Sequence, residues 1–181
     1  MVNIAYRVLL TFNATSLLLI IFSVHKKVTL DNFFPSCNWL LMLPDFASYL
    51  AYLAVPISLT WVSIYLSVFL GRDEFKKGEV KSIEHANNSF LPSYLGYFFV
   101  ALSVSSWETL WFVYSVIFVF TFLSQALYFN PLFLLFGYEF YNMNTESGAE
   151  IFLISSSRYK NPSDVEISRS YRINDYIFME R

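Results

Sequence analysis

The feature that most constrains this chain is the separation of its apolar and charged residues into long blocks. Charged residues make up only 14% of the 181 residues, whereas a typical soluble domain carries ~25%. They gather at residues 72–84 and in the segment after Tyr138, and the chain between these two clusters is nearly uncharged. Long apolar blocks of this kind are stable as helices in lipid. The pattern predicts an α-helical integral membrane protein.

Four blocks are predicted to be transmembrane helices, at residues 8–24, 46–70, 89–104 and 107–129. The last two belong to one apolar run from residue 90 to residue 136, which is roughly twice the length of one span. Ser105-Ser106-Trp107-Glu108 inside this run matches a capping box, which starts a helix. Glu108 is the run's one ionisable residue, and a charge is far more stable at the water interface than in lipid. We therefore expect a tight turn there.

The segments around these helices carry weaker signals. The first block also resembles a cleaved signal peptide, but no small-x-small motif precedes His25, so we expect an uncleaved anchor. Residues 29–47 are expected to form an interfacial or re-entrant connector. Pro56 is expected to kink the second helix. Residues 71–88 are expected to form a solvated loop with at most a short helical piece.

The four-helix membrane domain is predicted to occupy residues 1–137, and a polar C-terminal tail residues 138–181. Two apolar-polar stretches around Glu146-Ser147-Gly148 predict a β-hairpin in this tail. Further strand-like stretches follow at residues 165–171 and 176–179. About 40 residues are marginal for independent folding, so we expect the tail to pack on the membrane domain, a sister subunit or a partner.

The distribution of positive charge predicts the orientation. With four spans and the N-terminus inside, ten of the twelve Lys and Arg residues lie on the cytoplasmic side, the side that positive charge favours. Only Lys26 and Lys27 lie outside. A three-span arrangement would leave Glu108 in the membrane or one run far too long. We therefore predict that both termini are cytoplasmic.

The sequence offers no sign of catalysis, a cofactor or a metal centre. The motifs of metalloproteases, nucleotide-binding loops and serine hydrolases are absent. Cys37 stands alone, and His25 and His85 lack nearby ligands. The net charge of −2 gives no indication of direct nucleic-acid binding. Apart from the turn residue Glu108, the predicted spans contain no Asp, Glu, Lys, Arg or His, which argues against an ion-coupled transporter. Their Ser, Thr and Asn side chains serve either helix packing or, in an oligomer, a pore.

Three stretches of the C-terminal part carry a family resemblance. They are residues 130–141 (Asn-Pro-Leu-Phe-Leu-Leu-Phe-Gly-Tyr-Glu-Phe-Tyr), Leu-Ile-Ser at 153–155 and Arg-Ile-Asn-Asp-Tyr at 172–176. With the four-helix layout, they resemble KwaA, the family of membrane subunits of the Kiwa bacterial anti-phage system. The resemblance implies a homo-oligomer of the bacterial inner membrane, expected to be a tetramer. It also implies a soluble cytoplasmic effector resembling KwaB, and a role in detecting phage infection at the envelope.

Together these observations favour a non-enzymatic membrane sensor or anchor that recruits or regulates a soluble effector. The alternative is an oligomeric pore or small-solute channel. A small tail with mixed charges and exposed strand edges suits protein docking, and its removal after Tyr141 is expected to abolish recruitment. The basic residues expected to bind the partner are Lys76, Lys77, Arg158, Lys160, Arg169 and Arg172.

Overall fold

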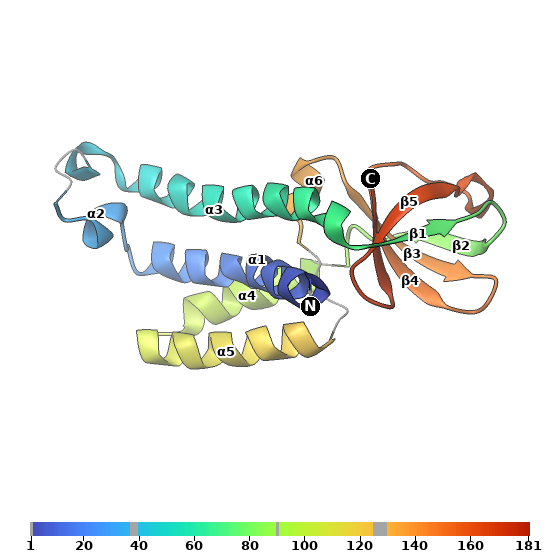
Figure 1. Ribbon diagram of the computed structural model, residues 1–181. Helices are drawn as coiled ribbons and strands as arrows, with labels where there is room; N and C mark the ends of the chain where they lie inside the picture. The colour runs from blue at the N-terminus through green and yellow to red at the C-terminus, as the bar shows by residue number, and fades with distance from the viewer. Residues whose placement is uncertain (1, 37–39, 90, 125–129) are drawn as a thin grey trace.

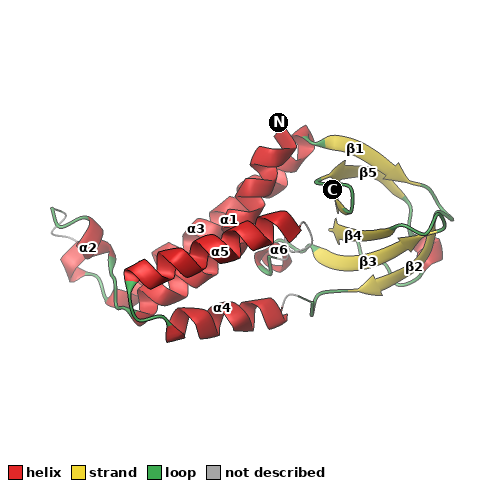
Figure 2. Ribbon diagram, turned by 90° about the horizontal axis from the view of Figure 1, so that it is seen from below, coloured by secondary structure: helices red, strands yellow, loops and turns green. Residues whose placement is uncertain are grey.

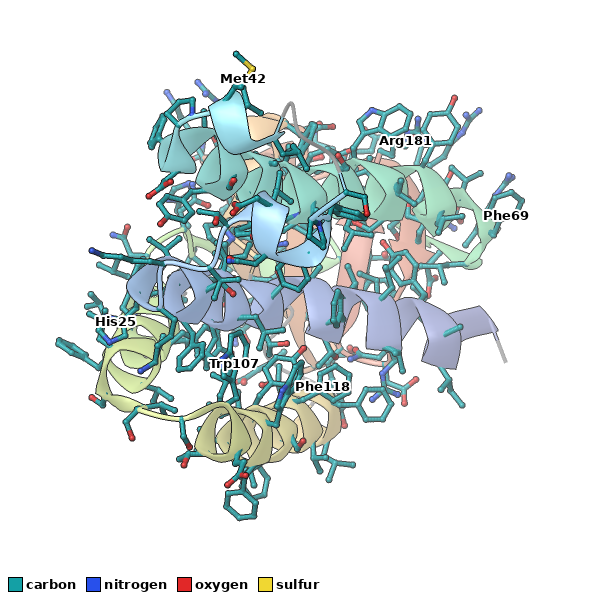
Figure 3. The ribbon with its side chains drawn as sticks, turned by 90° about the vertical axis from the view of Figure 1, so that its left-hand side faces the viewer. His25, Met42, Phe69, Trp107, Phe118 and Arg181 are labelled. Carbon is teal, nitrogen blue, oxygen red and sulfur yellow. The ribbon has the colours of Figure 1, made fainter. Side chains whose placement is uncertain are left out.

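The apolar blocks of the sequence form helices that run along one axis, and a β-sheet lies at one end of them (Figure 1). The structure is a computed structural model that describes residues 2–36, 40–89, 91–124 and 130–181. The three long helices are α1 (Val2–His25), α3 (Asp45–Leu66) and α5 (Trp107–Ser124). Helix α1 packs against α3 on one side and against α5 and the shorter α4 (Leu91–Ser103) on the other (Figure 3).

The interior of the helices holds polar side chains beside an apolar cluster around Leu18, Phe22 and Leu110, and the outer faces of the helices are apolar, unlike those of a soluble bundle. Buried side chains between them include Thr11, Asn13, Thr15, Thr60 and Ser63, all fully buried. Large apolar side chains instead face outward: those of Phe69, Phe99, Phe112 and Phe120 are each about two-thirds exposed or more. Polar groups find partners on other helices in lipid, and apolar side chains are stable against acyl chains. This arrangement marks the chain as a membrane protein.

Among the described residues, three helices are long and apolar enough to cross a membrane, namely α1, the segment from α3 through the 3₁₀ turn η2 (Ser67–Phe69), and α5. Helix α4 has 13 residues, about 20 Å at 1.5 Å per residue, which is less than the ~30 Å hydrocarbon core. The predicted fourth span is therefore not confirmed. Helix α4 nevertheless carries the chain from the sheet end back to the opposite end (Figure 1).

The predicted turn before Glu108 is confirmed, with the cap one residue later than expected. Helix α5 begins at Trp107, and the hydroxyl of Ser106, not Ser105, accepts the Thr109 N–H at 3.2 Å. The carboxylate of Glu108 is exposed in the first turn of α5, where a negative charge is favourable next to the helix N-terminus.

The connector between α1 and α3 holds two short elements at the end of the bundle away from the sheet. They are α2 (Leu30–Phe33) and the 3₁₀ turn η1 (Leu40–Met42), each shorter than a span. The side chains of Phe33 and Met42 project outward, 61% and 87% exposed. This agrees with the predicted connector. Cys37 and Trp39 lie outside the described residues.

Six strands form one sheet in the order β1-β5-β6-β4-β3-β2, and only the β4–β6 pair is parallel. The predicted hairpin is confirmed as β3 (Glu139–Thr145) and β4 (Glu150–Ser155), and Gly148 in its turn has φ +84°. The two later stretches form β5 (Ile167–Arg172) and β6 (Ile177–Glu180). The short helix α6 (Leu132–Leu135) leads into β3, and the 3₁₀ turn η3 (Pro162–Asp164) precedes β5.

The prediction of a solvated loop at residues 71–88 is wrong. This segment forms β1 (Gly71–Phe75) and β2 (Val80–His85), which are the two edge strands. Only four residues join them, so the two edges approach within about 17 Å at ~3.4 Å per residue. The sheet therefore curls into a half-barrel (Figure 2). The sheet thus combines two strands that precede α4 in the sequence with four strands that follow residue 138.

The placement of the chain ends gives a test of membrane crossing. The start of α1 and the β1–β2 turn lie at the same end of the bundle, and the last turn of α1, which Lys27 follows by two residues, lies at the other (Figure 1). In a Cys37→Ser background, we expect Asn3→Cys and Lys77→Cys to react with a membrane-impermeant maleimide from one face of sealed vesicles. Lys27→Cys should react only from the opposite face.

As a control, the labelling is repeated with sealed vesicles of the opposite orientation, in which the accessible and the protected cysteines should be exchanged. Reaction of Asn3→Cys and Lys77→Cys from opposite faces would contradict the helical path described here.

Candidate functional site at the helix–sheet junction

One continuous apolar core joins the helices to the sheet. We call it the junction core; it consists of Tyr6, Leu10, Ile64, Leu70, Ala86, Phe133, Tyr138, Phe140, Ile154, Tyr171, Ile173, Ile177 and Met179. Phe133 and Phe140 are completely buried in it, with ring centroids 6.2 Å apart. Burying one large apolar side chain stabilises a fold by about 1.5–3 kcal/mol. The sheet is therefore packed firmly on the helices.

Polar contacts reinforce the same junction. The Tyr6 hydroxyl of α1 donates to the Ser63 carbonyl of α3 at 3.0 Å. The guanidinium of Arg7 lies 5.1 Å from the centre of the Phe122 ring, which places the end of α5 beside the start of α1. Arg181 likewise lies 5.1 Å from the Tyr65 ring at the end of α3. Cation–π contacts of this kind suit the boundary between apolar and aqueous surroundings.

A buried amide node ties three elements together inside the helices. It consists of Asn13 on α1, Thr60 on α3 and Asn130 before α6, none more than 1% exposed. With its amide oriented to satisfy its neighbours, Asn13 donates to the Pro56 carbonyl at 3.1 Å. Its Oδ1 accepts from the Thr60 N–H at 3.2 Å and from Asn130 Nδ2 at 2.9 Å. Asn13 thus bridges two backbone groups of α3 next to the helix proline.

Asn130 extends this node toward the sheet. Its Oδ1 accepts the Leu132 N–H at 3.0 Å and so fixes the first turn of α6. Phe133 of the same turn belongs to the junction core. A shift of α1 against α3 therefore acts on α6, which immediately precedes β3.

The other face of the sheet has its own core, which a connecting segment covers. This core includes Phe75, Tyr141, Leu153 and Phe178. The segment between β4 and β5, residues 156–166, is here called the strap. Its Val165 is completely buried in this core, and its Tyr159 packs against it. The strap is thus an ordered part of the domain.

Glu139, the first residue of β3, holds the beginning of the strap. Its carboxylate pairs with Arg158 Nε at 2.9 Å and His85 Nε2 at 3.3 Å, and accepts from the Tyr141 hydroxyl at 2.8 Å. Partial burial alone would raise the pKa of Glu139. The Tyr141 hydrogen bond and the charges of Arg158 and His85 outweigh burial and lower that pKa. Glu139 is thus held as a carboxylate.

Glu180, the last residue of β6, holds the next part of the strap. Its carboxylate accepts hydrogen bonds from the hydroxyls of Ser155, Ser157 and Tyr159. Burial, followed by the hydrogen bond to Glu180, raises the pKa of Tyr159, so this phenol stays protonated and continues to donate. Two carboxylates therefore anchor the strap to the end of the sheet nearest the helices.

The six predicted partner-binding residues lie on three different segments of the chain. Arg158 and Lys160 lie on the strap, Arg169 and Arg172 on β5, and Lys76 and Lys77 in the β1–β2 turn. Three of them pair with acidic residues of this chain: Arg158 with Glu139, Arg172 with Asp73 at 2.6 Å, and Lys76 with Glu74 at 3.6 Å. Lys77, Lys160 and Arg169 are exposed.

Sequence reasoning missed the residues that organise the site. Glu139 and Glu180 stand at strand ends, and apart from Tyr141 their partners lie far away in the sequence. Asn13 stands in an apolar helix, where a polar side chain indicates a helix–helix contact without naming its partner. Among the described residues, no group of three His, Cys, Asp or Glu side chains is placed to hold a metal ion.

Comparison with known proteins supplies one match. A family model described as anti-phage protein KwaA matches residues 6–179, which span the elements from α1 to β6. No curated protein and no solved structure matches the chain.

The amide node predicts a measurable contribution to stability. Replacing Asn13→Leu removes the side chain that bridges α1 and α3 and leaves the Asn130 amide with fewer partners. Interhelical hydrogen bonds in membrane proteins contribute about 0.6–1.7 kcal/mol, so we expect the free energy of unfolding to fall by about 1 kcal/mol. Unfolding in mixed detergent micelles, followed by circular dichroism, measures this change.

Ser58→Ala is the matched control, because the exposed Ser58 hydroxyl bonds only within its own helix, to Ala54. It should change stability by less than about 0.5 kcal/mol. Equal effects of the two substitutions would show that the node has no special role.

Proposed function

Because this chain belongs to the KwaA family of anti-phage proteins, we propose that it is a non-enzymatic membrane sensor or anchor. In this proposal it recruits or regulates a soluble cytoplasmic effector, as in the Kiwa system. The helices receive a stimulus at the membrane, and the sheet presents the result to the effector. The effector would resemble KwaB.

The junction core is the observation that carries this proposal. A signal received in the membrane needs a mechanical connection to the aqueous side. Leu10 of α1 and Ile64 of α3 pack in the same core as Phe140 of β3 and Met179 of β6. Packed cores do not deform continuously, so a displacement of α1 or α3 is expected to move the sheet as well.

The sheet also offers a firm surface for a partner. Glu139 and Glu180 hold the strap in place, and Lys160 projects from it. Lys77 and Arg169 add exposed positive charge around the β1 edge. Exposed charges at the rim of an interface raise association rates and specificity. We propose these three exposed residues as part of the docking surface.

The distribution of charge supports an orientation with the sheet in the cytoplasm. Ten of the twelve Lys and Arg residues belong to Arg7, to the β1–β2 segment or to the chain after residue 138. Both the start of α1 and the sheet lie at one end of the bundle (Figure 1). Positive residues near spans favour the cytoplasmic side. We therefore propose a multi-pass inner-membrane protein with both termini cytoplasmic.

The exposed faces of the helices leave room for self-association. Helix α1 is covered by α3 on one side and by α4 and α5 on the other, yet Phe12 remains 41% exposed on it. Lateral contacts between protomers in lipid would cover such faces. We propose a homo-oligomer, with a tetramer as the expected form.

Charge reversal tests recruitment better than deletion of the tail. Removal of the chain after Tyr141 would also remove Ile154 and Ile177 from the junction core. The triple variant Lys77→Glu, Lys160→Glu, Arg169→Glu changes only exposed side chains. We expect it to insert normally and to co-purify about tenfold less of the soluble effector from host membranes. Protection against phage should fall in parallel.

Lys26→Glu with Lys27→Glu is the control, because these residues lie at the opposite end of the bundle; recruitment should be unchanged. Undiminished recruitment by the triple variant would overturn the docking surface. A conductance in planar bilayers, without a stoichiometric soluble partner, would instead favour the pore.

A further inference from the structure

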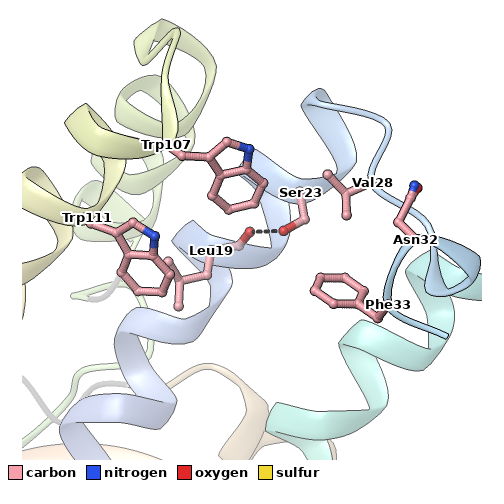
Figure 4. Close-up of a pocket in the computed structure, with 7 residues that line it drawn as sticks. All are labelled: Leu19, Ser23, Val28, Asn32, Phe33, Trp107 and Trp111. Atoms are coloured by element: carbon pink, nitrogen blue, oxygen red, sulfur yellow. Dashed lines mark hydrogen bonds between the residues drawn. The ribbon is translucent and has the colours of Figure 1, made fainter.

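At the end of the bundle opposite the sheet, a cleft of about 630 Å³ opens between α5 and the α1–α2 segment (Figure 4). Its walls include Trp107 and Trp111 on one side and Phe33 on the other, with Leu19 and Ser23 of α1 between them. The volume falls within the ~300–1,000 Å³ typical of small-molecule sites. The cleft is therefore large enough for a ligand.

The walls of the cleft are almost entirely apolar. The hydroxyl of Ser23 already donates to the Leu19 carbonyl at 2.8 Å, shown as the dashed line in Figure 4. Trp107 and Trp111 stand in the first turns of α5, beside the exposed Glu108. Tryptophan is enriched where hydrocarbon meets the headgroups. A ligand at this depth is most stable if it is a hydrocarbon chain.

Two lysines follow α1 directly, next to residues that contact or form the cleft wall. Lys26 Nζ lies 5.6 Å from the centre of the Phe22 ring, and Phe22 packs edge-on against Trp107 with ring centroids 4.8 Å apart. Lys27 follows directly and is exposed. An ammonium group is a strong partner for phosphate oxygens.

The backbone at Lys27 is unusual for a lysine. Its φ of +53° is the left-handed conformation that closes α1, and Val28 N–H bonds back to the Ser23 carbonyl at 2.9 Å. Glycine is the usual residue at this position of a helix end. The turn also directs Val28 onto the cleft wall. A charged residue occupies a site where the backbone favours glycine.

We propose that this cleft binds an acyl chain of a membrane phospholipid, with the headgroup phosphate held by Lys26 and Lys27. The apolar walls select the chain, and the lysines select the phosphate. The carboxylate of Glu108 adds a negative charge near the lysines, so the ligand need not be anionic overall. Phosphatidylethanolamine matches both charges, because its phosphate can pair with the lysines and its ammonium group with Glu108. The proposal rests on the membrane placement of the helices and does not depend on an effector.

Tryptophan fluorescence tests the site in detergent, where no other phosphate competes. Trp39→Phe with Trp61→Phe leaves Trp107 and Trp111 as the only indoles. We expect phosphatidylethanolamine with brominated acyl chains to quench them saturably. Brominated diacylglycerol, which lacks the phosphate, should need about 25-fold higher concentration, since each of the two lysines contributes about a factor of five near a phosphate surface.

Two variants separate the site from ordinary lipid contact. A protein that retains only Trp61, which is 55% exposed on α3, should be quenched without saturation and equally by both lipids. Lys26→Gln with Lys27→Gly should bind the phospholipid no better than the diacylglycerol. Glycine suits the backbone at position 27, so the fold should survive, as an unchanged melting temperature would verify.

The proposal would be overturned by equal quenching with the two lipids in the Trp107–Trp111 protein. It would equally be overturned by a Trp61 protein that responds like the Trp107–Trp111 protein, since that pattern means unspecific lipid contact only.

Discussion

The structure depends on the packing of transmembrane helices against one face of a curled sheet. Inside the helices polar groups meet polar groups, as at Asn13 and Thr60, and their outer faces are apolar. At the sheet this rule changes, because Leu10 and Phe133 pack against strand residues as in a soluble core. The junction core therefore connects the helices, whose outer faces are apolar, with the sheet in one folded unit. A displacement of the helices is transmitted to the sheet only if this core remains intact.

The parts of the fold that the sequence predicted correctly are local. The turn at Glu146-Ser147-Gly148 needs only neighbouring residues, and the capping serine before Glu108 needs only one helical turn. The edge strands were missed because residues 71–85 are rich in charge and pair only with distant partners, as Gly71 does with Arg172. Strand propensity is weak in such a segment, and nothing nearby reveals the register.

The six basic residues predicted to bind a partner lie on the sheet and its connections, and their role in binding stays a prediction. Which of them form ion pairs within the chain depends on tertiary contacts that the sequence does not reveal. Arg172 on β5 forms an ion pair with Asp73 on β1, and Arg158 on the strap forms one with Glu139. Fourteen acidic residues could have served as partners, and only the sheet pairing selects among them.

Hydrogen exchange of the protein in lipid nanodiscs tests most directly whether helices and sheet are one unit. Leu10→Ala creates a cavity on the α1 side of the junction core, and such truncations cost about 2–5 kcal/mol. The account predicts faster amide exchange in β3 and β6 as well as in α1, with no change after Phe112→Ala on the outer face of α5. Faster exchange confined to α1, with the sheet unaffected, would contradict it.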